Sequence, residues 1–64
     1  MDTSSFKVGQ KVKFVLDAPG LNLPAGTVAS ITDIIANGAN GIVRIRSGNI
    51  IGTIADDGFI EAAD

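Results

Sequence analysis

The feature that most constrains the fold is residues 42–55, where two β-branched runs are separated only by Gly48-Asn49. A two-residue hairpin turn needs a positive φ at its first central residue, which glycine adopts without strain. The loop length sets the register, so Ile45 is expected to face Gly52. Alternation then buries one apolar face and directs the following residues outward: Arg44, Arg46, Ile51 and Thr53.

The composition limits what such a chain can do. With 64 residues, it has room for one domain, which buries only about 60% of its unfolded surface. It contains no Cys, His, Trp or Tyr, and so lacks the thiol nucleophile, the neutral-pH base, the usual zinc ligands and the preferred aromatic anchors of tight interfaces. We therefore expect no enzyme activity and no cofactor. Asp56-Asp57 lacks the ligand spacing of a calcium loop, and we expect no metal site.

Turn residues divide the chain into five expected strands: 11–16, 27–35, 42–47, 50–55 and 59–62. The long loop at 17–26 holds both prolines and two glycines, which exclude a central strand. Its residues Leu21 and Leu23 are expected to cover the core. Val28 and Ile31 are three positions apart and cannot both be buried by strict alternation, which predicts a bulge or a strong bend near residues 29–30.

The ends of the chain add two expectations. Residues 1–5 are small and polar and predict a disordered tail, followed by a single domain over residues 6–64. The start of the chain has no basic and apolar signal, and no apolar run approaches the roughly 20 residues of a membrane helix. We expect a soluble protein without a membrane span, and a cytoplasmic location because there is no cysteine to stabilise the fold in an oxidising compartment.

Two segments resemble a known superfamily. Residues 7–14, KVGQKVKF, resemble the x-G-x-x-V opening of many SH3-like barrels. Residues 25–31, AGTVASI, resemble the second strand of the electron-transport accessory proteins, which include a small photosystem I protein, the ferredoxin:thioredoxin reductase variable chain and the nitrile hydratase β-chain barrel. The Gly-x-Val-x-x-Ile pattern is also similar to KOW elements of ribosomal and transcription-elongation proteins. The resemblance implies an all-β fold, a small five-stranded SH3-like barrel with a long loop between strands 1 and 2.

The basic residues suggest where such a domain would bind. Lys11, Lys13, Arg44 and Arg46 all point away from the expected core and would form a basic stripe if the fold brings their strands together. Ile51 lies beside Arg46, and exposed aliphatic residues of this kind mark a surface for self-association or for a larger partner. Ordinary solvation of the sheet would also explain the charged positions.

These features lead to two functional hypotheses. The first is a non-enzymatic protein–protein interaction module, an accessory or structural subunit or adaptor, that binds through six residues: Lys11, Lys13, Leu21, Arg44, Arg46 and Ile51. The second is a KOW-like nucleic-acid or ribosome-associated protein that uses the same basic stripe. The net charge of −2 and the pI near 4.7 argue against the second hypothesis.

Overall fold

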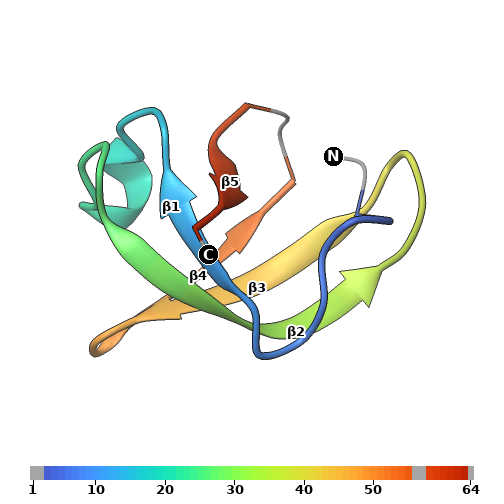
Figure 1. Ribbon diagram of the computed structural model, residues 1–64. Helices are drawn as coiled ribbons and strands as arrows, with labels where there is room; N and C mark the ends of the chain where they lie inside the picture. Colours follow the sequence, from blue (N-terminus) through green and yellow to red (C-terminus); the bar gives the residue numbers. More distant parts are fainter. Residues whose placement is uncertain (1–2, 56–57, 64) are drawn as a thin grey trace.

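The strands of this protein form one antiparallel sheet. The computed structural model describes residues 3–55 and 58–63 (Figure 1). In chain order the elements are β1 (Lys11–Phe14), the 3₁₀ helix η1 (Pro19–Leu21), β2 (Val28–Ala36), β3 (Ile42–Ser47), β4 (Ile50–Ile54) and β5 (Ile60–Ala62). The strand order is β4-β3-β2-β1-β5. The all-β class is therefore confirmed, but β4 and β5 do not pair with each other in the described residues, and the sheet is open rather than a closed barrel.

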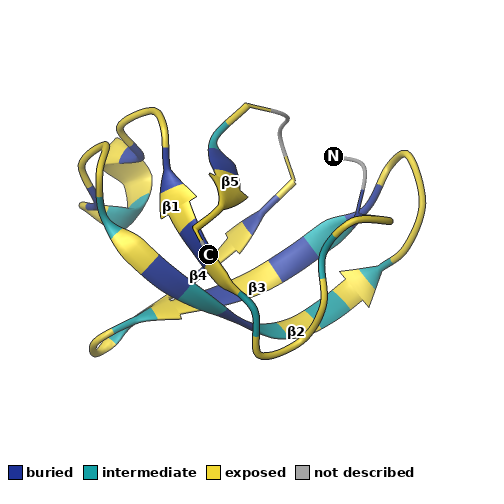
Figure 2. Ribbon diagram, in the orientation of Figure 1, coloured by how far each residue is buried: buried dark blue, intermediate teal, exposed yellow. Residues whose placement is uncertain are grey.

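The sheet has one buried face. Exposed and buried residues alternate along β1, β3 and β4, as Figure 2 shows. The largest fully buried side chains come from three strands: Phe14, Ile31, Ile45, Val12 and Val43. This alternation at period two is what a sheet with one solvated face requires. No helix in the described ranges is long and apolar enough to cross a membrane.

The predicted hairpin over residues 42–54 is confirmed. β3 and β4 pair in the predicted register, with Ile45 opposite Gly52 and Arg46 opposite Ile51. Gly48 has a φ of 61°, the positive value that the first central residue of the turn requires. Val43, Ile45 and Ile54 of the hairpin are buried, whereas Arg44 and Ile51 point outward.

The first strand is shorter than predicted. It ends at Phe14 rather than Leu16, and Leu16 is 51% exposed instead of buried. The pairing of β1 with β2 stops at Phe14, because the N–H of Gly26 donates to the carbonyl of Phe14 at 2.7 Å. That hydrogen bond closes the long loop, so the residues after Phe14 belong to the loop.

The irregular pairing predicted near residues 29–30 lies further along β2, and the burial of Val28, on which the prediction was based, was wrong. Ala29 and Ile31 are buried and Val28 is 50% exposed, so alternation is regular at the start of β2. The β2–β3 register shifts later, between Ile31 and Asp33 and again before Ala36. The small side chain of Ala29 fills the core position that the sequence interpretation assigned to Val28.

The long loop covers one end of the core. Leu23 is buried and Leu21 is half-buried against the core cluster, as predicted. The 3₁₀ helix η1 in this loop was not predicted. It begins at Pro19 and is followed by Asn22 in the left-handed region, with φ 57°. Proline suits the first position of a helix, and asparagine is the non-glycine residue that adopts this conformation most readily.

Two segments outside the expected strands are the start of the chain, residues 1–5, and the expected turn at residues 56–57. Thr3 is buried, and its N–H donates to the carbonyl of Gly38 at 3.2 Å. Within the expected disordered tail, Thr3 therefore packs against the β2–β3 loop, whereas Ser4 and Ser5 are exposed. The expected turn at Asp56-Asp57 lies outside the described residues.

Candidate functional site

Three of the predicted binding residues lie in one row across the sheet. Lys11 on β1 pairs with Ser30 on β2, and Ser30 pairs with Arg46 on β3. Arg46 in turn pairs with Ile51 on β4. Residues directly opposite each other in an antiparallel sheet point to the same side, so this row lies on the face opposite the core. We call the outward-pointing residues of β1–β4 the outer face: Lys11, Lys13, Val28, Ser30, Arg44, Arg46, Ile51 and Thr53.

The outer face combines positive charge with apolar surface. Lys13 pairs with Val28 on one side and with Glu61 of β5 on the other. Val28 is 50% exposed and Ile51 is 60% exposed. Exposed aliphatic side chains near arginine are typical of surfaces that bind other proteins.

Arg44 differs from the other cations of the outer face. Its Nη1 atom lies 3.3 Å from Oδ2 of Asp33, and both side chains are about half exposed. Such an exposed ion pair contributes only about 0–1 kcal/mol to stability. It does, however, offset the charge of Arg44, so this residue adds little to the basic stripe predicted from the sequence.

The three remaining cations surround one short piece of β2. Nε of Arg46 donates to the carbonyl of Gly48 at 2.8 Å, which holds its head group beside the β3–β4 turn. The Ser47 hydroxyl donates to the carbonyl of Val28 at 3.0 Å and so places that turn beside β2. Lys11, Lys13 and Arg46 therefore lie around Val28 and Ser30; we call these three cations the cationic bracket.

Leu21 does not belong to the outer face. A Cβ atom added to Gly52 would lie 2.5 Å from Cδ1 of Leu21, so this leucine covers the buried side of β4. The sheet itself separates Leu21 from Ile51. The structure thus does not bring together all six residues of the predicted binding site.

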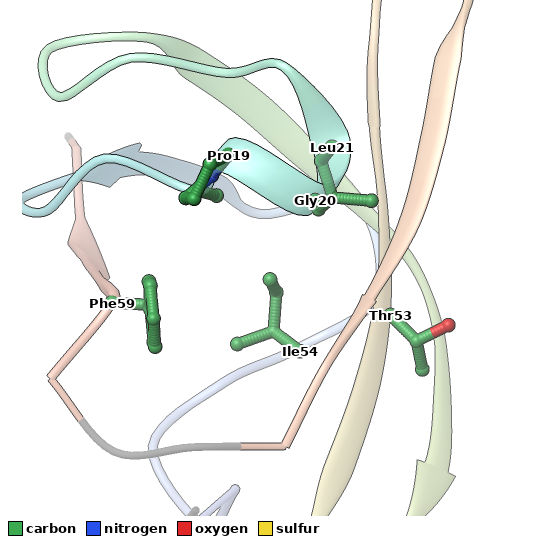
Figure 3. Close-up of a pocket in the computed structure, with 7 residues that line it drawn as sticks. Pro19, Gly20, Leu21, Thr53, Ile54 and Phe59 are labelled. Atoms are coloured by element: carbon green, nitrogen blue, oxygen red, sulfur yellow. The ribbon is translucent and has the colours of Figure 1, made fainter.

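Leu21 instead helps to line a small pocket between η1 and the end of β4 (Figure 3). The pocket has a volume of about 180 Å³, and its lining residues are Ala18, Pro19, Gly20, Leu21, Thr53, Ile54 and Phe59. None of these side chains titrates near neutral pH or acts as a strong nucleophile. The pocket can accept an apolar group, and none of its described lining side chains supplies an acid, a base or a metal ligand.

Val28 and Ser30 are the outer-face residues that the sequence interpretation missed. Val28 was expected in the core, although Ala29 and Ile31 already form an alternating pair that would have placed it outside. Ser30 has no such signal in the sequence, because a serine on a strand is unremarkable until its neighbours are known. Comparison of the chain with protein-family models, with curated proteins and with solved structures finds no match in any of the three.

Proposed function

We propose that this chain is a non-enzymatic protein-interaction module that binds a larger partner through its outer face. The observation that supports this best is the exposure of Val28 and Ile51 on the same face as the cationic bracket. A partner that covers these exposed apolar side chains removes their surface from water, and this burial favours binding. The role would be that of an accessory or structural subunit or an adaptor, acting in the cytoplasm.

The proposal includes an SH3-like fold. In its favour are the five strands, the central position of β2 in the order β4-β3-β2-β1-β5, the long loop after β1 and the tight turn between β3 and β4. An interaction role is compatible with this fold but does not follow from it, because small barrels carry many unrelated functions. The proposed function therefore depends on the outer face and not on the fold.

A KOW-like nucleic-acid-binding role is the alternative, and the cationic bracket is the observation in its favour. Two further observations weigh against it. Phe14 is buried, and Phe6 and Phe59 are partly buried against the core, so the three aromatic side chains of the chain offer little stacking surface for bases. The net charge is also negative, which repels a polyanion at long range.

The test is affinity capture by the tagged domain from an extract of the cells that produce it, at low and at high salt. Ile51→Ser should abolish capture of the partner without unfolding the domain, since Ile51 is exposed on β4. Lys7→Gln is the matched control, because Lys7 is exposed in the turn before β1 and outside the outer face. A protein retained by the control and lost with Ile51→Ser supports the proposal. Equal capture by both variants contradicts it, and nucleic acid captured only at low salt would favour the alternative.

A further inference from the structure

Ser30 holds a special position in the sheet. Among the described strand pairs it is the residue of β2 that pairs on both sides, with Lys11 of β1 and with Arg46 of β3. Neighbouring strands lie about 4.8 Å apart, so the Cα atoms of Lys11 and Arg46 are roughly 10 Å apart with Ser30 between them. Both cationic side chains are exposed and long enough to approach one small anion above the serine.

The cationic bracket keeps unused hydrogen-bonding capacity. In the described part of the chain, the ion pair on this face joins Arg44 to Asp33, outside the bracket. Arg46 is held by one hydrogen bond from Nε to Gly48, and a guanidinium has four further N–H groups on its terminal nitrogens. A cation that is already fixed in position loses less entropy when it binds an anion.

The acids around the bracket limit the size of that anion. Glu61 lies next to Lys13 at the β5 side, and Asp33 lies next to Arg44 further along the sheet. A polynucleotide crossing this face would bring successive phosphates near those two carboxylates, and like charges repel. One or two carboxylates held between Lys11 and Arg46 stay away from both acids.

From this arrangement we propose that the cationic bracket recognises a carboxylate of an acidic side chain on a protein partner, with Ser30 as a hydrogen-bond donor between the two strands. The inference rests on the proposed docking function and specifies its partner. That partner presents Asp or Glu beside an apolar residue, and the apolar residue covers Val28, which lies between Lys13 and the β3–β4 turn. Charge complementarity selects the partner, and the exposed aliphatic residues supply the contact area.

A direct test uses two short peptides with blocked ends, Gly-Glu-Leu-Glu-Gly and its uncharged counterpart Gly-Gln-Leu-Gln-Gly. Each is titrated into the isotopically labelled domain while the backbone amide NMR signals are followed. The acidic peptide should shift the amides of residues 11–13, 28–30 and 46–48. It should bind about tenfold more tightly than the uncharged peptide at about 0.01 M salt, and the difference should shrink at about 0.5 M salt.

Single-residue variants distinguish binding at the cationic bracket from a general effect of positive charge. Lys11→Gln and Arg46→Gln should each weaken binding of the acidic peptide about fivefold, whereas Lys7→Gln should not. Equal binding of the two peptides, or an equal loss with Lys7→Gln, would overturn the inference. Tighter binding of an oligothymidylate of eight nucleotides than of the acidic peptide would also overturn it, in favour of nucleic acid.

The two proposals fail in different ways. If a captured partner depends on Ile51 but not on Lys11 or Arg46, the docking function stands and the carboxylate inference is wrong. If the acidic peptide binds at the bracket while no captured protein depends on Ile51, the anion site stands and the docking function is wrong.

Discussion

Replacement of Gly52 by alanine tests how the long loop is held against the sheet. A Cβ atom at this position would lie 2.5 Å from Cδ1, 2.6 Å from Cδ2 and 3.1 Å from Cγ of Leu21. Gly52 is not among the glycines with positive φ, so alanine fits the backbone and the effect is purely steric. Either Leu21 changes its rotamer or η1 moves away from β4, and both responses loosen the end of the core.

The magnitude follows from two opposing contributions. Forcing an extra carbon into a packed site costs about 1–3 kcal/mol. Alanine restricts the unfolded chain more than glycine does, which returns about 0.4–1 kcal/mol. We therefore expect Gly52→Ala to lower the free energy of unfolding by about 1–2 kcal/mol, and the Tm of a domain of this size by about 4–8 °C per kcal/mol.

Urea unfolding followed by far-ultraviolet circular dichroism measures this change, because the chain has no Trp or Tyr for a fluorescence assay. The matched background is Leu21→Ala, which removes the atoms that clash and by itself costs about 1–2 kcal/mol for a half-buried leucine. In that background Gly52→Ala should be neutral or stabilise the domain by up to about 1 kcal/mol, and the coupling energy then equals the steric cost of about 1–3 kcal/mol. The same loss in both backgrounds, or no loss in either, would refute the steric argument.

Three further predictions concern the hairpin, the core and the outer face. Gly48→Val should lower stability by about 1 kcal/mol or more in urea unfolding, because valine is strained at a φ of 61°. Gly20→Ala should be nearly neutral, because φ is not positive and an added Cβ atom would meet no atom of a non-neighbouring residue within 4 Å. Equal effects of the two substitutions would contradict the turn geometry. Phe14→Ala should cost about 3–5 kcal/mol, enough to show as lost native dichroism or a much lower Tm, because this ring is fully buried. Asp33→Asn should change stability by less than about 1 kcal/mol, since its ion pair with Arg44 is exposed, and a larger loss would show that the pair is more than a surface contact.

The local parts of the fold could be predicted because their cause is local. Gly48-Asn49 between two β-branched runs determines both the turn and the pairing of Ile45 with Gly52, and the structure has that register. The prolines and glycines of residues 17–26 likewise predicted an irregular loop. The end of β1 could not be predicted, because Val12, Phe14 and Leu16 form one regular apolar pattern. Where its pairing with β2 stops depends on backbone hydrogen bonds to distant residues, such as the one from Gly26 to Phe14.

The sequence could predict which residues of the candidate site point outward, but not how they are arranged relative to one another. Alternation within a strand shows that Lys11 and Arg46 point outward, but it says nothing about their distance from each other. Ser30 brings them into one row because β2 pairs with β1 and with β3 at that residue. The ion pair of Arg44 with Asp33 depends on the β2–β3 pairing. The position of Leu21 against Gly52 depends on how the long loop packs on β4.

The sequence by itself determined the all-β class, the β3–β4 hairpin and the absence of Cys, His, Trp and Tyr. These properties follow from side-chain chemistry and from contacts between residues close together in the chain. The tertiary structure alone decided that the sheet is open, that Val28 is exposed, and that Lys11, Lys13 and Arg46 surround Val28 and Ser30. Those outcomes depend on contacts between distant segments, whose relative positions are set by the packing of one shared core.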